Sequence, residues 1–112
     1  MPWKNGGGST REILRVPESS DDWQWRLSIA EIAADGPFSA FPGCERSLTL
    51  LAGAGMSLQF ADRRCDLHSP YAACRFAGEE TPECVLFNGP TVDFNAIWRR
   101  DAVSITVERR AM

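Results

Sequence analysis

The chain has 112 residues and a formal net charge of −3, from 12 basic and 15 acidic side chains. This length suits one domain, and a composition of 44% hydrophobic and 24% charged residues is typical of a globular protein, not of a disordered, collagen-like or coiled-coil chain. The acidic balance argues against nucleic-acid binding, and no apolar stretch reaches the roughly 18–20 residues that a membrane helix needs.

The first half of the chain predicts strands separated by turns. Residues 10–16 form the first expected strand. Over residues 23–30, aromatic and branched side chains alternate with polar ones, which indicates a strand with one apolar face. Its polar face, with Arg26 and Ser28, faces either solvent or a pocket. Residues 36–43 contain two prolines, which predicts a loop or a short edge segment.

The second half of the chain also predicts short strands separated by turns. Residues 47–52 and 56–60 are strand-like runs around the glycine-containing link 53–55, a pattern that predicts a hairpin, and 62–66 reads as a charged loop. Only residues 30–35 have a helical pattern. Several short strands with closely spaced turn signals predict an all-β sandwich or barrel. The remaining expected strands are 85–87, 92–99 and 103–108.

The cysteines and the start of the chain bear on the compartment. Four cysteines in 112 residues are too few for a disulfide scaffold, so we expect free buried thiols. The first residues lack the basic-then-apolar layout of a secretory signal, and we therefore expect a cytoplasmic protein. The cysteines are Cys44, Cys65, Cys74 and Cys84.

Familiar catalytic and metal-binding motifs are absent. Gly6, Gly7 and Gly8 are not followed by the Lys-Ser/Thr pair of a phosphate loop, which favours a tight bend or a close backbone approach. Cys65 and His68 have Cys-x2-His spacing, but the later cysteines fit no common zinc module. One histidine and no Gly-x-Ser-x-Gly elbow also disfavour a catalytic triad. We expect no metal, no cofactor and no catalytic residues.

A looser set of polar residues, most of them on the expected strands, suits a small acid. Guanidinium groups bind carboxylates in a bidentate manner, and amides and hydroxyls orient a ligand. The pattern alone favours the alternative, in which Arg26 and Arg99 form structural ion pairs with Glu12 and Asp93. The set comprises Lys4, Asn5, Thr10, Arg11, Glu12, Arg26, Ser28, Asp93, Asn95 and Arg99.

Four sequence blocks carry a family resemblance. They are WKNGGGSTRE at 3–12, WRLSIA at 25–30, GPFSAFPG at 36–43 and GPTVDFN at 89–95, with Arg99-Arg100 after the last. In these blocks and their order, the chain resembles the HutD/Ves family. The resemblance implies a cupin-like (RmlC-like) β-barrel or sandwich of mainly antiparallel strands with little helix, in a cytoplasmic bacterial protein. One branch of the family is linked to histidine utilisation.

The resemblance also implies a function. It suggests a non-enzymatic protein that binds a small carboxylate-bearing metabolite, such as a formylated glutamate, in a regulatory or stress-related role. The family lacks the paired histidines and the glutamate by which other cupins hold a metal. We expect Arg11, Arg26 or Arg99 to hold the acid group. The expected ligand-binding residues are Lys4, Asn5, Thr10, Arg11, Glu12, Arg26, Ser28, Phe38, Ser39, Phe41, Asp93, Asn95 and Arg99.

The resemblance also bears on the length of the chain, because members of this family usually contain two barrels in one chain. We expect residues 1–112 to form a single cupin-like domain, about one half of that arrangement, and to pair as a homodimer. Two alternative functions stay open. One is a metal-independent isomerase or lyase that uses Glu12 or Asp93 as a general base. The other is a protein-interaction module without a small ligand.

Overall fold

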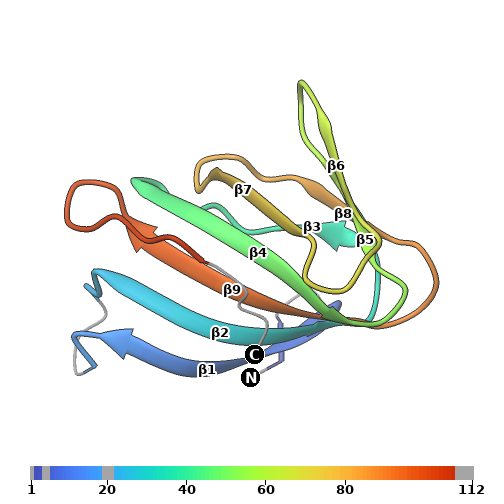
Figure 1. Cartoon of the computed structure of the whole chain (residues 1–112), viewed down its shortest axis with the longest axis horizontal. Helices are drawn as coiled ribbons and strands as arrows, with labels where there is room; N and C mark the ends of the chain where they lie inside the picture. The colour runs from blue at the N-terminus through green and yellow to red at the C-terminus, as the bar shows by residue number, and fades with distance from the viewer. Residues whose placement is uncertain (1, 4–5, 19–21, 108–112) are drawn as a thin grey trace.

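Alternating side chains produce nine strands and no helix in the part of the chain that the computed structural model describes, residues 2–3, 6–18 and 22–107 (Figure 1). The strands are antiparallel and form a five-stranded sheet, β1-β2-β9-β4-β7, and a four-stranded sheet, β3-β8-β5-β6. The expected all-β fold is confirmed. The strands are β1 (Gly8–Val16), β2 (Trp25–Ile32), β3 (Gly36–Pro37), β4 (Cys44–Ala52), β5 (Met56–Gln59), β6 (Arg64–Leu67), β7 (Ala73–Ala77), β8 (Glu83–Leu86) and β9 (Thr91–Arg99).

The register of the larger sheet decides which side chains share a face. β9 lies between β2 and β4, and side chains opposite each other across neighbouring strands point the same way. Arg26, Ile97 and Arg46 form one row across β2, β9 and β4. Two residues along the strands, Ser28 lies opposite Asn95 on the same face. Polar residues from three strands therefore meet on the inner side of this sheet.

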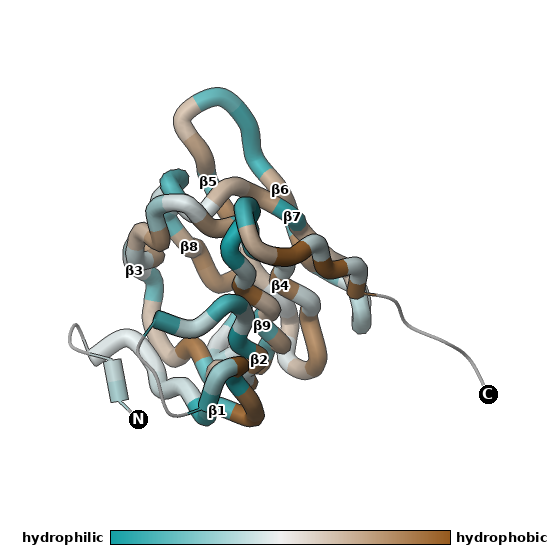
Figure 2. Tube along the Cα trace, turned by 90° about the vertical axis from the view of Figure 1, so that its left-hand side faces the viewer, coloured by the Kyte–Doolittle hydropathy of each residue, from teal (hydrophilic) through white to brown (hydrophobic). Residues whose placement is uncertain are grey.

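Apolar side chains fill the rest of the space between the sheets. On β4, Leu48 and Leu50 continue the inner face beyond Arg46, and each is only 1% exposed. The β5–β6 hairpin extends from this core, and Figure 2 shows the hydrophilic residues at its tip. The core cluster consists of Ile32, Phe38, Leu48, Leu50, Met56, Leu58, Leu67, Cys74, Phe76 and Cys84.

The predicted hairpin over 47–52 and 56–60 is wrong. β4 pairs with β7 and β9, whereas β5 pairs with β6 and β8, so the link crosses from one sheet to the other. Gly53 and Gly55 make this crossing with φ angles of 97° and 102°, which favour glycine. A Cβ atom on Gly55 would lie 2.0 Å from the carbonyl oxygen of Leu67. These glycines permit the change of sheet.

Three smaller predictions also differ from the structure. The helical pattern at 30–35 is overridden because β2 continues to Ile32, whose side chain is buried in the core. The expected loop at 62–66 contains the start of β6 at Arg64. Of the expected strand 103–108, residues 103–107 are not a strand, since they do not join the hydrogen-bonded ladder of either sheet, and residue 108 lies outside the described part of the chain.

β2 does not turn its apolar face toward the space between the sheets, as a simple amphipathic strand would. Trp25, Leu27 and Ile29 lie half-buried on the outer side of the larger sheet. The polar alternates, Arg26 and Ser28, face inward, so that the second of the two sequence interpretations, a pocket wall, is the observed one. The alternation identified the strand correctly, but it did not identify the inner face.

The cysteines are free thiols, as expected, and Cys44, Cys74 and Cys84 are buried, whereas Cys65 is half-buried. Burial raises the pKa of Cys74 and of Cys84 to about 12, which makes these two thiols poor nucleophiles. The described residues contain no helix long and apolar enough to cross a membrane.

Candidate functional site

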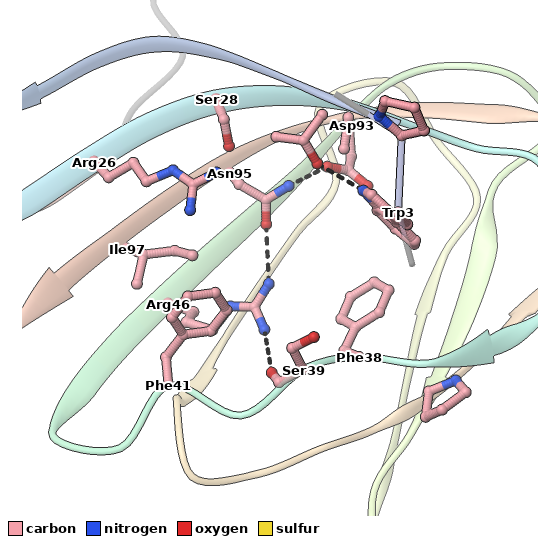
Figure 3. Close-up of a pocket in the computed structure, with 14 residues that line it drawn as sticks. Trp3, Arg26, Ser28, Phe38, Ser39, Phe41, Arg46, Asp93, Asn95 and Ile97 are labelled. Atoms are coloured by element: carbon pink, nitrogen blue, oxygen red, sulfur yellow. Dashed lines mark hydrogen bonds between the residues drawn. The ribbon is translucent and has the colours of Figure 1, made fainter. Parts of the chain in front are cut away.

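A cavity of about 520 Å³ opens between the inner face of the larger sheet and the segment after β3 (Figure 3). This volume is within the roughly 300–1,000 Å³ that is typical of small-molecule sites. The walls combine aromatic rings with a few polar groups. They are formed by Pro2, Trp3, Thr10, Arg26, Ser28, Ala30, Pro37, Phe38, Ser39, Phe41, Arg46, Asp93, Asn95 and Ile97.

Arg46 places a buried cation at the cavity wall. Its side chain extends from β4 and is 6% exposed. Nη1 donates to the carbonyl oxygen of Ser39 at 3.3 Å, and Nη2 donates to Oδ1 of Asn95, also at 3.3 Å. Nε has no hydrogen-bond partner among the described residues. The guanidinium therefore retains donors that the protein does not use.

Three phenylalanine rings surround this guanidinium. Its central carbon lies 5.4 Å from the centroid of Phe38, 5.1 Å from that of Phe41 and 5.0 Å from that of Phe76. Such contacts stabilise a cation while excluding water. Burial lowers the pKa of Arg46 to about 10, and Asp93 opposes this effect. Arg46 consequently remains charged at neutral pH in a largely apolar setting.

Asp93 is the acidic counterpart of Arg46. It extends from β9 and is wholly buried. Oδ1 accepts a hydrogen bond from Nδ2 of Asn95, so that Asn95 bridges the arginine and the aspartate (Figure 3). Oδ2 has no hydrogen-bond partner among the described residues. Burial raises the pKa of Asp93 to about 7, although Arg46 and the Asn95 hydrogen bond act in the opposite direction.

Trp3 closes the cavity beside β1, and Gly8 makes room for it. The indole Nε1 donates to the hydroxyl of Thr10 at 2.7 Å, and the ring packs edge-on against Phe38 with centroids 6.3 Å apart. A Cβ atom on Gly8 would lie 2.4 Å from the carbonyl oxygen of Glu31 and 3.2 Å from the Trp3 ring. The sequence interpretation of close backbone approach is therefore confirmed at Gly8.

Most of the predicted ligand-binding residues lie around this cavity. β1, β2 and β9 supply hydroxyl, amide, carboxyl and guanidinium groups, and the segment after β3 supplies two aromatic rings and one more hydroxyl. Lys4 and Asn5 lie outside the described residues. The predicted residues at the cavity wall are Thr10, Arg26, Ser28, Phe38, Ser39, Phe41, Asp93 and Asn95.

Arg11, Glu12 and Arg99 are not among the lining residues. Arg11 is exposed on β1. Glu12 is partly exposed and pairs with Nε of Arg26 at 3.2 Å, which is one of the structural ion pairs that the sequence suggested. Arg99 does not pair with Asp93, because it is the last residue of β9 and its Nη2 lies 2.9 Å from Asp22. Alternation along β9 places Asp93 and Arg99 on the same face of the sheet, but Ile97 is the last residue of β9 that lines the cavity.

Sequence reasoning missed the central cation, Arg46. The expected strand began at residue 47, and the family blocks do not include position 46. A signal was nevertheless present, because Arg46, Leu48 and Leu50 alternate, which places an arginine on the buried face of a strand. The other lining residues outside the prediction are Pro2, Trp3, Ala30, Pro37 and Ile97.

No three histidine, cysteine or acidic side chains come together as a metal-ion site in the described ranges. His68 is exposed and stacks on Phe87, with ring centroids 4.9 Å apart. The Cys-x2-His spacing at 65–68 therefore has no partner ligands in that part of the structure.

Comparisons with known proteins agree with this fold. The HutD family model matches residues 1–112. An uncharacterized 21.2 kDa protein in the hutC 3′ region of Pseudomonas putida is 46% identical over 99 residues, which are 88% of this chain and 52% of that protein. HutD from Pseudomonas fluorescens SBW25 superposes with a TM-score of 0.84 at 43% identity, over 90% of this chain and 55% of that one. The chain thus spans about half the length of these relatives.

More distant structures show the fold alone. The Cupin_2 domain of an XRE family transcriptional regulator from Enterobacter cloacae has a TM-score of 0.64 at 12% identity, over 82% of this chain and 96% of that one. The cupin-like architecture expected from the sequence is confirmed by this likeness together with the two antiparallel sheets.

Proposed function

The chain belongs to the HutD family and has a cupin-like fold, and from its cavity we propose that it binds a small carboxylate-bearing molecule. The observation that carries this proposal is Arg46, a buried guanidinium at the cavity wall with an unused Nε donor. A planar guanidinium matches a carboxylate in shape and charge. This arginine takes the role that the sequence gave to Arg11, Arg26 or Arg99.

The cost of burying Arg46 supports the proposal. A buried charge without a close, well-bonded partner destabilises the folded state, whereas an apolar residue of similar volume would pack against the surrounding rings without that cost. In the described part of the chain no carboxylate lies within salt-bridge distance of Arg46. An anionic ligand would supply a direct partner, whereas Asp93 is joined to Arg46 only through Asn95.

The other residues that line the cavity indicate which kind of ligand would fit it. Trp3, Phe38 and Phe41 offer apolar surfaces to a hydrocarbon or aromatic body, while Ser28 and Asn95 offer hydrogen bonds. We therefore propose a ligand with one acid group and a compact, partly apolar body. A regulatory or stress-related role, a cytoplasmic location and a homodimer stay predictions.

A thermal-shift panel tests the binding of acids. Phenylacetate, succinate, glutarate and N-acylated amino acids are compared with neutral amides of the same skeleton. A ligand at about 100 times its Kd adds about 2.7 kcal/mol to the free energy of unfolding, so a binding acid raises Tm by several degrees while its amide does not. Equal behaviour of every acid and its amide would show that the cavity does not recognise carboxylates.

A second candidate function rests on Asp93. A buried carboxyl with a pKa near 7 at a cavity wall has the properties of a general base, as in a metal-independent isomerase or lyase. Glu12, the other proposed base, is partly exposed, ion-paired and not among the lining residues.

Exchange of carbon-bound hydrogen separates binding from this chemistry. Because we propose binding alone, phenylacetate and mandelate are expected to keep their α-hydrogens when incubated with the protein in D2O and followed by proton NMR. Exchange that depends on the protein and disappears in Asp93→Asn would instead support the enzyme.

A further inference from the structure

Oδ2 of Asp93 is a buried polar atom without a hydrogen-bond partner among the described residues. Binding of an acid to Arg46 would not by itself give it one. We propose that a carboxylate enters the cavity together with one proton, which Asp93 takes up, and that Asp93 then donates a hydrogen bond from Oδ2 to an oxygen of the ligand. This inference rests on the proposed function and adds to it the protonation state of the site. The inference selects an acid that carries a net negative charge and has oxygen acceptors. A zwitterion is not selected, because its ammonium group would cancel that charge.

The charges around Asp93 lead to this conclusion. Arg46 faces it from β4, and the two groups together are neutral when Asp93 is ionised. Arg26 faces the same cavity from β2, but Glu12 already balances its charge at 3.2 Å. Burial and the charge of Asp93 both raise the pKa of Cys84 on β8, so that thiol is neutral and adds no charge to the site. An entering carboxylate would therefore leave the described site with one excess negative charge.

Protonation of Asp93 removes this excess. Two carboxylates that share a water-excluded site do not both remain ionised, and one of them binds a proton. Oδ1 of Asp93 already accepts from Asn95, which leaves Oδ2 as the oxygen that would carry the proton. The proton comes from solvent, and no covalent bond to carbon forms or breaks.

The geometry also explains how the proton would be used. Asp93, Asn95 and Arg46 are joined in one hydrogen-bonded series along the cavity wall (Figure 3). A ligand carboxylate held by Arg46 would then receive a second hydrogen bond from Oδ2, on the other side of Asn95. The pKa of Asp93, already raised to about 7 in the free protein, means that proton uptake near neutral pH requires little free energy.

Affinity should consequently depend on pH in a defined direction. Above about pH 7, where free Asp93 is ionised, the affinity for a carboxylate is expected to fall by up to about tenfold per pH unit. Between about pH 5 and 6, Asp93 is already protonated, and the affinity should change little. Asp93→Asn, which mimics the protonated side chain, should remove this dependence.

Calorimetry with phenylacetate measures the proton directly. Titrations near pH 8 in phosphate and in Tris, which differ in ionisation enthalpy, should give an uptake of about 0.9 proton per phenylacetate bound, because a group with a pKa near 7 is about 10% protonated there. The carbon-13 signal of the Asp93 carboxyl in the wild-type protein should show its pKa rising when phenylacetate is added. Asp66→Asn, on β6 and not among the lining residues, is the matched control and should keep the full uptake.

The outcomes separate this inference from the proposed function. Phenylacetate binding that requires Arg46 but takes up no proton, or releases one, would overturn the inference and leave carboxylate binding intact. Uptake that persists in Asp93→Asn would overturn it too, because another group would then be the acceptor. If phenylacetate causes neither heat nor any shift of the Asp93 signal, and no panel acid raises Tm, the proposed function fails and the inference fails with it.

Discussion

Asp93→Asn is expected to stabilise the free protein near pH 8, by about 2 to 4 kcal/mol, and to change its stability little near pH 4. The pKa of Asp93 is raised from 3.8 to about 7 by burial. Between these values the folded protein holds a proton that the unfolded chain has released, so the free energy of unfolding decreases as pH rises through this window. Asparagine does not titrate and avoids the loss, while its oxygen can still accept from Asn95.

Urea unfolding of both proteins from about pH 4 to pH 8 measures this difference. Glu80→Gln is the control of opposite sign, because the hydrogen bond from Arg63 lowers the pKa of Glu80 and makes its ionised form stabilising. We expect Glu80→Gln to reduce stability at neutral pH and to approach the wild type in acid. A gap between Asp93→Asn and wild type that does not grow with pH would contradict a raised pKa at Asp93.

Such a result would mean that the cavity is maintained at the expense of stability. Arg46 and Asp93 are both desolvated, and each has an atom without a hydrogen-bond partner among the described residues. Sites that bind ligands commonly keep polar groups that the fold alone would not favour. The same property that makes Asp93 destabilising in the free protein makes it ready to accept a proton when an acid binds.

The sequence predicted four strands of the larger sheet, β1, β2, β4 and β9, but it predicted neither β7 nor the way the chain passes between the sheets. β2 and β9 are long enough for their period of two to be unmistakable, and each was recognised. The link at Gly53 and Gly55 carries the same local signal whether it closes a hairpin or changes sheet. Only long-range packing, such as the approach of Leu67 to Gly55, distinguishes the two.

In the candidate site, too, the residues that follow a local pattern were predicted, and the residue that depends on long-range strand pairing was missed. Arg26, Ser28, Asp93 and Asn95 were predicted together because β2 and β9 both carry alternating polar residues in the family blocks, and the two strands are paired in the structure. Arg46 is 49 positions from Asn95 along the chain, and its contact with that side chain depends on the pairing of β4 with β9. No local pattern specifies that pairing.

Arg46→Met is expected to weaken the binding of phenylacetate by at least about 100-fold, which corresponds to about 2.7 kcal/mol of lost interaction. Methionine fills a similar volume among the three rings but removes the charge and every donor. Arg46→Lys keeps the charge without the planar fork, so we expect an intermediate loss of about tenfold. Titration calorimetry near pH 6 measures all three proteins while Asp93 is largely protonated.

Arg75→Met supplies the matched control for this series. Arg75 lies on β7, where its guanidinium carbon is 5.0 Å from the centroid of the Trp98 ring, and it is not among the residues that line the cavity. The substitution removes the same charge and the same kind of aromatic contact, so a general effect of net charge would weaken binding in both variants. We expect Arg75→Met to bind phenylacetate as the wild type does. Equal losses in Arg75→Met and Arg46→Met, or undiminished binding by Arg46→Met, would show that the buried guanidinium does not hold the acid.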